Sequence, residues 1–508
     1  MKNLFLKLII PTIVIGCTLL LIYYAKGYRF DLVDNTFIKT GIVHVETQPT
    51  RANYWLTEDF TGRTPRIISS VPEGEYVLDI WLDGYHGIKY DIEVFAERST
   101  PLSVFLFKEE PEVEIAQEIE GEILQIHTSK GRNNVLIFVE REAGETQRNY
   151  EILKYQTNTK FWQLGNNPST IFTFSIGLES EITDISVSPN DKNILLTIIG
   201  QDSDDLELLP TGKHIISLDT KTTLAEVSDI VENFKWSHDG ETLIWENDQG
   251  INKLNLKEPE TPVLVYTPQE DTEILYYDSY TNGEIYLLLK EESEQFVSLA
   301  RIDTNLEETF LIENIYYQTE ERFLEEFRES EIIEYKPFTN SPQSTLFVGE
   351  PETFLISREH EKIIFNTEFA SYLYDIEKDK YVLINPYQSE ILDFSPDGEK
   401  LSFLSLENEK LGFFIFEKET SNYSIELGGG YTADYINRED CHDFAWHQNS
   451  NNIYYSCENS LYVTDIRTDI NINLVREFGG RILLGNSKQI VTINEEENSL
   501  EIVEYTVN

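Results

Sequence analysis

The segment Phe394-Ser395-Pro396-Asp397-Gly398-Glu399 decides the fold, because variants of it recur between apolar runs along the chain. Proline fixes the backbone angle φ and Asp-Gly supplies the conformations that a tight turn requires, so the segment predicts the turn of a β-hairpin. Three further copies are clear: Val187-Ser188-Pro189-Asn190-Asp191, Trp236-Ser237-His238-Asp239-Gly240-Glu241 and Trp446-His447-Gln448-Asn449-Ser450. We therefore expect a series of similar hairpins.

The spacing of the hairpins indicates how they are arranged. With weaker copies beginning at Ser279, Ile356 and Leu483, the repeats begin 37 to 52 residues apart, except for one interval of 77 residues. Repeats of about 40 to 45 residues with about four strands each are typical of β-propeller blades. A degenerate copy over Ile126–Phe138 brings the expected number of blades to eight, and seven is the alternative.

The two ends of the propeller segment are expected to close the ring. The last unit, Arg481–Val507, supplies three strands, and we expect Glu112–Ile119 to be the fourth, which leaves no open sheet edge.

The interval of 77 residues between repeats contains Phe323 and Phe327, four residues apart as on one face of a helix. We therefore predict a helical insertion near residues 318–334.

The Ser-Pro-Asp-Gly-Glu turns resemble the WD-like repeats of TolB-type propellers, and the resemblance extends over residues 115–508. It implies a rigid all-β ring whose loops surround a channel mouth, with residues 108–508 as the propeller domain.

Residues 41–107 show the alternation of half-buried strands, and after the turn Pro72-Glu73-Gly74-Glu75-Tyr76 the even-numbered positions from Tyr76 to Leu82 share one face. This stretch resembles the PEGA domain, a small β-sandwich of bacterial envelope proteins. The resemblance is carried by this turn, the strand after it and Asp83-Gly84-Tyr85, with Glu75 in place of the family's alanine. It implies a structural or interaction module.

Three aromatic residues of this stretch, Tyr54, Trp55 and Trp81, are candidates for stacking on a glycan if they share an exposed face. Aromatic side chains in so small a sandwich more often fill the core, which is the interpretation we favour.

The N-terminal segment predicts a membrane anchor. Residues 8–25 carry no charge, and such a helix extends about 27 Å, close to the thickness of the hydrocarbon core of a bilayer. Alternatives are a cleaved signal peptide and a lipoprotein acylated at Cys17, but the sequence stays apolar beyond Cys17. We expect a cytoplasmic tail and anchor over residues 1–30, a linker over 31–40, and the bulk outside the cytoplasm, at the cell surface or in the periplasm.

Composition limits the partners. The chain has 90 acidic and 40 basic residues among 508 and a formal net charge of −50. Nucleic-acid binding depends on Lys and Arg that neutralise phosphates, so no nucleic-acid partner is expected. Besides the lipid bilayer, we expect an envelope protein or a glycan as the partner.

The sequence contains no Gly-x-Ser-x-Gly, His-Glu-x-x-His or P-loop motif. We expect no catalytic residue, no cofactor and no metal site. The favoured function is a non-enzymatic scaffold or binding protein that presents a propeller. The alternative is an enzyme that processes glycans or peptides at the channel mouth.

Cys441 and Cys457 lie on either side of the last clear repeat. If Trp446 lies opposite Asn452 in the hairpin, the same register places Cys441 opposite Cys457. Opposed side chains at a non-hydrogen-bonded pair approach disulfide distance, and an extracytoplasmic compartment allows oxidation. A disulfide and a pair of buried thiols are both left open.

Overall fold

The structure is a computed structural model. It describes residues 14–18, 21–24, 26–31, 36–128, 134–156, 168–201, 208–227, 233–257, 259, 262–279, 283–291, 296–318, 336–337, 347–356, 362–375, 380–385, 388–405, 410–415, 430–437, 441–468, 470–476, 478, 480–485, 489–494 and 499–504.

The described residues before the first strand are helical over 14–18 and 21–24. None of the described helices is long and apolar enough to cross a membrane. The anchor predicted over residues 8–25 lies partly outside the described residues. The predicted cytoplasmic tail and most of the helical insertion predicted near residues 318–334 also lie outside them.

The N-terminal strands form two four-stranded sheets that pack face to face, here called the sandwich. Strand β2 pairs with β1, with β5 and, in parallel, with β8, while the second sheet has the order β4-β3-β6-β7. The strands are β1 (Tyr28–Asp31), β2 (Thr36–Gln48), β3 (Asn53–Thr57), β4 (Phe60–Arg63), β5 (Arg66–Pro72), β6 (Gly74–Trp81), β7 (Ile88–Val94) and β8 (Ser99–Phe105).

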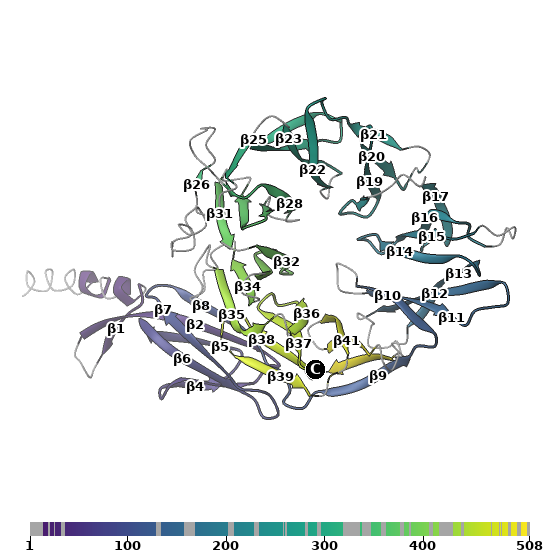
Figure 1. Cartoon of the computed structure of the whole chain (residues 1–508). Coiled ribbons are helices and arrows are strands. Elements are labelled where there is room, and N and C mark those ends of the chain that lie inside the picture. Colours follow the sequence, from purple (N-terminus) through teal and green to yellow (C-terminus); the bar gives the residue numbers. More distant parts are fainter. Residues whose placement is uncertain are drawn as a thin grey trace, which may run out of the picture.

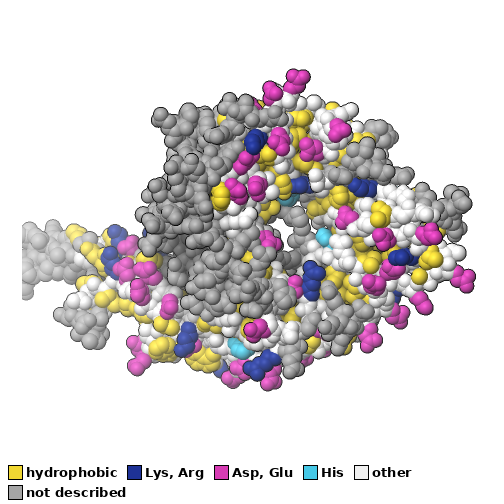
Figure 2. Space-filling view, viewed as in Figure 1, with side chains coloured by type: hydrophobic (Ala, Val, Ile, Leu, Met, Phe, Trp, Pro, Cys, Tyr) yellow, Lys and Arg dark blue, Asp and Glu magenta, His cyan; other side chains and the backbone are white. Residues whose placement is uncertain are grey.

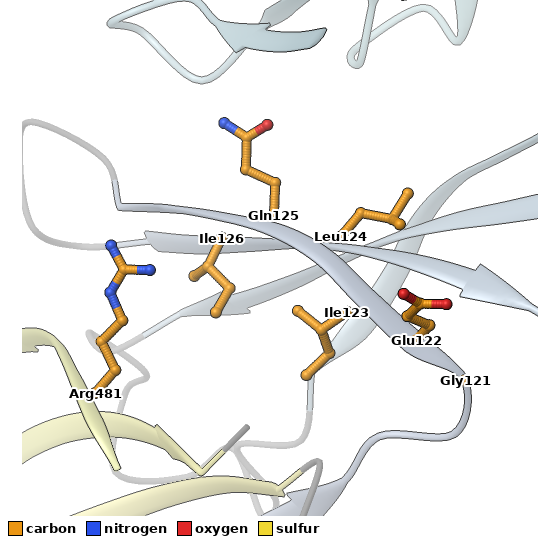
Figure 3. A pocket seen from close by; sticks show the side chains of 7 residues that line it. All are labelled: Gly121, Glu122, Ile123, Leu124, Gln125, Ile126 and Arg481. Carbon is orange, nitrogen blue, oxygen red and sulfur yellow. The ribbon is translucent and has the colours of Figure 1, made fainter. Parts of the chain in front are cut away.

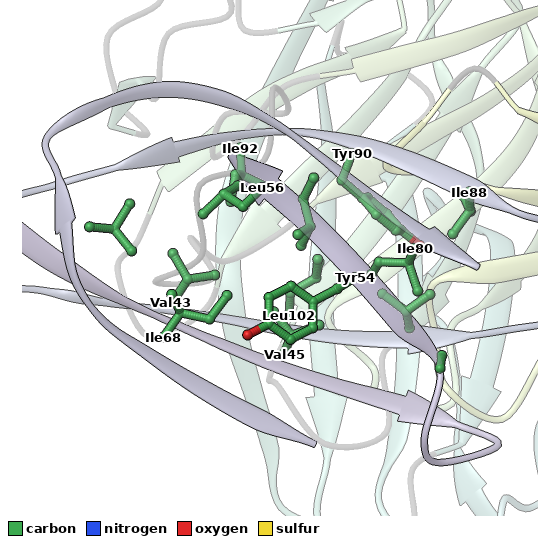
Figure 4. Close-up of a cluster of buried hydrophobic side chains, with 14 of the residues drawn as sticks. Val43, Val45, Tyr54, Leu56, Ile68, Ile80, Ile88, Tyr90, Ile92 and Leu102 are labelled. Atoms are coloured by element: carbon green, nitrogen blue, oxygen red, sulfur yellow. The ribbon is translucent and has the colours of Figure 1, made fainter. Parts of the chain in front are cut away.

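The core of the sandwich follows from the alternation seen in the sequence. Leu78 and Ile80 of β6 are fully buried, whereas Val77 and Trp81 on either side of them are exposed. The inward side chains of both sheets meet in one apolar cluster (Figure 4). Burying each large apolar side chain stabilises the fold by about 1.5–3 kcal/mol, so this cluster holds the two sheets together.

The predicted linker over residues 31–40 is wrong for its described part. Asp31 ends β1 and Thr36 begins β2, and the two strands pair from Tyr28 with Lys39 to Asp31 with Thr36. The chain therefore passes from the N-terminal helical residues straight into a β-hairpin that belongs to the sandwich.

The remaining strands follow in chain order. They are β9 (Glu112–Glu118), β10 (Glu122–Thr128), β11 (Asn134–Arg141), β12 (Gln147–Gln156), β13 (Ser169–Gly177), β14 (Glu181–Val187), β15 (Asn193–Ile199), β16 (Gly212–Ser217), β17 (Thr222–Val227), β18 (Lys235–Trp236), β19 (Thr242–Asn247), β20 (Gly250–Asn255), β21 (Val263–Tyr266), β22 (Thr272–Ser279), β23 (Ile285–Glu291), β24 (Phe296–Ile302), β25 (Glu308–Gln318), β26 (Lys336–Pro337), β27 (Phe347–Val348), β28 (Pro351–Ile356), β29 (Lys362–Thr367), β30 (Ser371–Asp375), β31 (Lys380–Asn385), β32 (Ser389–Phe394), β33 (Lys400–Ser405), β34 (Lys410–Ile415), β35 (Gly430–Asn437), β36 (Cys441–Trp446), β37 (Asn452–Cys457), β38 (Ser460–Asp465), β39 (Asn471–Val475), β40 (Arg481–Gly485), β41 (Gln489–Asn494) and β42 (Ser499–Glu504).

Within the described ranges these strands form eight sheets of four or five strands, which succeed one another around a ring (Figure 1). Strands β10, β14, β22, β28, β32 and β36 lie on the inner side of the ring. Buried apolar side chains join each sheet to the next, and a last cluster with Val491 and Val135 joins the eighth sheet to the first. Each sheet is thus covered on both faces by its neighbours.

The ring closes through its two ends. Strand β9 pairs antiparallel with β42, from Glu112 with Glu504 to Glu118 with Ser499, and becomes the outermost strand of the eighth sheet. The prediction that Glu112–Ile119 supplies this strand is confirmed. Closure pairs backbone groups that an open sheet edge would leave exposed.

The sandwich is fixed to the ring by a buried polar contact. Arg467, next to the end of β38, forms an ion pair with Asp465 at 2.6 Å, and each side chain is 2% exposed. Tyr90 of the sandwich donates its hydroxyl to Asp465 Oδ2 at 2.6 Å and accepts from Arg467 Nη2 at 3.2 Å. Phe105 and Phe107 add apolar contact with His447 and Tyr454 of the seventh sheet. These contacts hold the sandwich against the seventh sheet of the ring.

Candidate functional site

The predicted turn motifs lie where the first strand of a sheet meets the second, and their side chains close the turn. Ser237 Oγ donates to Asp239 Oδ1 at 2.5 Å and accepts from the Thr242 amide at 2.9 Å. The backbone φ of Gly240 is +68°, and a Cβ there would lie 2.6 Å from Asn190 Cγ of the preceding sheet. This turn position requires glycine.

The other motif turns repeat this arrangement and link neighbouring sheets. Ser188 and Ser395 make the same hydroxyl contacts within their turns, and the amide of Asp397 donates to Ser450 Oγ of the next sheet at 2.9 Å. Pro189, Pro396 and Gly398 complete the turns at residues 188–191 and 395–398. We assign all of these residues a structural role in the ring.

Two tryptophans lie on the outer face of the β4-β3-β6-β7 sheet. Trp55 is 43% exposed and Trp81 is 40% exposed. Trp55 pairs with Asp79 across the strands and Trp81 pairs with Asn53, so the two indoles are diagonal neighbours on one face. Such neighbours are about 7–8 Å apart, a spacing that suits a flat ligand lying across both rings. We call the outer face of this sheet around Trp55, Trp81 and their cross-strand partners Asp79 and Asn53 the tryptophan face.

Tyr54 does not belong to this face. Its side chain is 4% exposed and packs in the core of the sandwich among Val45, Leu102 and their neighbours (Figure 4). The stacking prediction is therefore wrong for Tyr54, and the core prediction is wrong for Trp55 and Trp81. Strand alternation separates them, because adjacent residues point to opposite faces.

The tryptophan face carries an acidic excess. Asp79 forms a surface ion pair with Lys89 at 3.2 Å. Glu75, Asp91 and Glu93 occupy the outward positions of the same two strands and are exposed. Anionic polymers would be repelled from such a surface, whereas neutral sugars would not.

A cavity of about 620 Å³ lies between the first strand of the first sheet and the first strand of the eighth. It is lined by Gly121, by Glu122–Ile126 of β10 and by Arg481 of β40 (Figure 3). Gln125 and Leu124 point to the side away from Ile123 and Ile126, and the two isoleucines pack on the core between the sheets. The guanidinium of Arg481 lies 3.4 Å from Asp443. Figure 2 shows acidic and basic side chains around the opening of the ring.

A disulfide joins Cys441 and Cys457, which are opposed in β36 and β37 with Cα atoms 4.2 Å apart. The register on which the sequence argument depended is wrong, because Trp446 lies opposite Ile453 rather than Asn452. A bulge between His442 and Ala445, with Asp443 at φ +56°, shifts the register by one residue before the cysteines. Cys17 is a free, exposed cysteine.

The motif from Pro72 to Tyr76 forms the tight connection between β5 and β6. Tyr76 donates its hydroxyl to the carbonyl of Pro72 at 2.9 Å, and the amide of Glu73 donates to the Lys39 carbonyl at 3.1 Å. Burial raises the pKa of Tyr76 above its ordinary value. Gly74 opens β6, while Glu73 and Glu75 are exposed. Residues 40–110 match the PEGA domain.

Comparison with curated proteins finds no match to the whole chain or to a part of it. Among solved structures, the dipeptidyl peptidase 4 of Porphyromonas gingivalis is 8% identical with a TM-score of 0.42, covering 80% of this chain and 59% of the peptidase. The Dos1 propeller is 9% identical with a TM-score of 0.39, covering 78% of this chain and 95% of that one. Hsv2p of Kluyveromyces lactis is 10% identical with a TM-score of 0.37, covering 76% and 98%.

Outside the PEGA domain, Lys235 is a group that sequence reasoning missed. Its ammonium lies 3.3 Å from the ring centroid of Tyr276 and 5.5 Å from that of Tyr277, both on β22 of the next sheet. Burial lowers the pKa of Lys235 to about 8, although the nearby carboxylate of Asp278 favours its charged form. Burial also raises the pKa of Tyr276 to about 12. No local motif distinguishes this lysine, because its neighbours come from another repeat.

This burial predicts a pH dependence of stability. An unfolded chain binds the Lys235 proton with a pKa of about 10.4, so between that value and the folded pKa of about 8 the unfolded state binds more protons. Stability then rises with pH over this window, by at most about 1.4 kcal/mol per unit. The Lys235→Met variant lacks this rise. Denaturant unfolding of the parent and the variant between pH 7.5 and 9.5 measures the difference. Both proteins retain Tyr276 and Tyr277, so the same pH dependence of the unfolding free energy in both would contradict the role of Lys235.

Among the residues with described positions, no group of three or more His, Cys, Asp or Glu side chains is placed to hold a metal ion. Two surfaces of the described residues that suit a ligand are the tryptophan face of the PEGA domain and the cavity at β10 and β40.

Proposed function

We propose that this chain is a membrane-anchored, extracytoplasmic scaffold that binds a neutral envelope glycan on its PEGA domain and presents an eight-bladed propeller with TolB-type, WD-like repeats. Residues 8–25 would span the bilayer, with the N-terminus in the cytoplasm and the body at the cell surface or in the periplasm. We propose no catalytic role for the channel mouth.

The exposed pair Trp55 and Trp81 carries the glycan part of this proposal. Two indoles on one flat sheet face offer apolar surface to the C–H faces of sugar rings, and neither ring is needed to fill the core. Asn53, Asp79 and Lys89 beside them offer donors and acceptors for sugar hydroxyls. The acidic excess of the same face favours neutral sugars over phosphate-rich or sulfated polymers.

The rigid joint to the ring supports the scaffold part. Tyr90, Asp465 and Arg467 hold the PEGA domain against the seventh sheet, so a glycan bound to the first would fix the position of the second. Loops around a propeller channel then face a constant direction, as recognition of a second partner requires.

Binding to a glycan array and to soluble peptidoglycan fragments tests the proposal. Trp55→Ala and Trp81→Ala should each weaken glycan binding roughly thirty-fold, because removing a tryptophan from a binding surface typically costs about 2 kcal/mol. Phe310→Ala is the matched control, since Phe310 is an aromatic residue of β25 that is also 45% exposed. Equal losses in all three variants, or no glycan bound by the parent chain, would refute glycan recognition by this face.

A further inference from the structure

The helical residues before β1 join the PEGA domain without a flexible spacer. The amides of Lys26 and Gly27 donate to the carbonyls of Ile22 and Tyr24 at 2.9 and 3.1 Å, and the Thr40 amide then donates to the Gly27 carbonyl at 3.0 Å. Gly27 has φ +81°, and a Cβ there would lie 2.8 Å from the Thr40 carbonyl oxygen. The chain thus turns directly from the helix into the β1–β2 hairpin.

Five aromatic side chains surround this turn, and we call them the aromatic collar: Tyr23, Tyr24, Tyr28, Phe30 and Phe37. They come from the end of the helix and from both strands of the hairpin. Their exposed fractions include 49% for Tyr23, 62% for Tyr24, 47% for Phe30 and 55% for Phe37. The rings touch one another, with centroids 5.1 Å apart for Tyr23 and Tyr28 and for Phe30 and Phe37. A sheet that needed these rings for its core would bury them, so they are available to a partner.

A basic side chain ties the collar to the PEGA domain. The guanidinium of Arg29 lies 3.8 Å from the ring centroid of Tyr24, and its Nε donates to Ser70 Oγ of β5 at 3.0 Å. Residues 23–41 contain three basic residues (Lys26, Arg29, Lys39) and two acidic ones (Asp31, Asp34), a net charge of +1 in a chain of −50. This is therefore a part of the acidic chain that an anionic surface does not repel.

We propose that the aromatic collar lies in the headgroup region of the lipid bilayer and sets the angle at which the PEGA domain stands on the membrane. Aromatic side chains with basic neighbours concentrate at this level of membrane proteins. Tyr23 and Tyr24 lie at the end of the uncharged stretch of residues 8–25 and the other rings follow it, which places the collar at the expected depth. This inference rests on the proposed anchor, and its test separates the two.

The test uses the full chain in vesicles of phosphatidylcholine and phosphatidylglycerol, in a Cys17→Ser background, with an environment-sensitive fluorophore on one new cysteine. Phe37→Cys reports on the collar, Leu21→Cys on the anchor, and Thr61→Cys on an exposed position of β4 away from the collar. Spin-labelled lipids with the quencher at the headgroup or in the acyl chain then locate each fluorophore.

We expect headgroup quenching at position 37 to be at least five-fold stronger than at position 61, with acyl-chain quenching strongest at position 21. Quenching at 21 but a water-like signal at 37 would overturn the collar and leave the anchor intact. Water-like signals at both would overturn the anchor and the collar together. A blue-shifted signal at 37 that neither the headgroup nor the acyl-chain quencher reduces would show that protein covers this surface, which also overturns the proposal.

Discussion

Replacing Arg467 with alanine is expected to lower the free energy of unfolding by about 3–5 kcal/mol, because it leaves the carboxylate of Asp465 buried without its partner. Both side chains are 2% exposed. Tyr90 and the backbone carbonyl of Ser103 also lose the guanidinium, which contacts them at 3.2 and 3.0 Å. The loss falls on the joint between the PEGA domain and the ring, so the two parts should separate before either unfolds.

Thermal unfolding of the full chain in detergent, followed with limited proteolysis, measures this effect. Arg467→Ala should show an early transition and new cleavage between the PEGA domain and β9, and the parent chain should show neither. Lys89→Ala is the control, because the Lys89 and Asp79 pair lies on the surface with the lysine side chain 67% exposed. A single transition for Arg467→Ala within about 1 kcal/mol of the parent would show that the buried pair does not hold the joint.

The second large effect is expected at the disulfide. Cys441 and Cys457 are 16 residues apart in sequence, and a cross-link that closes a loop of about this length stabilises a fold by roughly 3 kcal/mol. The double variant Cys441→Ala/Cys457→Ala should therefore unfold at a lower denaturant concentration than the parent. The hairpin itself stays paired in the folded state through the backbone ladder of β36 and β37.

Reduction provides the matched comparison. Dithiothreitol should destabilise the parent chain and the Cys17→Ser variant by similar amounts and leave the double variant unchanged. Mass mapping without reductant should recover the two cysteines in one linked pair of peptides when the chain is produced in an oxidising compartment. Free thiols at both positions in such material, or a reductant effect that survives in the double variant, would contradict the assignment.

Local patterns predicted the parts of the fold that local chemistry determines. The turn Ser395-Pro396-Asp397-Gly398 is closed by its own side chains, so it was visible in one stretch of sequence. Strand alternation predicted that Leu78 and Ile80 would share one face of their strand, and both are buried. The all-β fold and the PEGA resemblance are confirmed on this basis.

Other features depend on residues that are far apart in the chain and were missed. The contact between Tyr90 and Asp465 joins residues 375 positions apart, and no local sequence pattern at either residue predicts it. Because of the bulge at Asp443, the cross-strand partner of Trp446 is Ile453 rather than the expected Asn452. One extra residue in a strand changes every pairing beyond it. Trp55 and Trp81 were expected in the core because aromatic side chains in so small a sandwich more often fill it. A single strand does not reveal which of its faces a second sheet covers.

The closing strand also determines how the molecule would respond to mechanical tension. A pull between the PEGA domain and the ring would travel along the chain into β9, whose ladder among the described strands is to β42. The outermost strand would peel away first and open the circle of sheets at that seam. The contacts of Tyr90 with Asp465 and Arg467, and of Arg467 with the Ser103 carbonyl, would carry part of the load to the seventh sheet and so reduce the load on the pairing of β9 with β42.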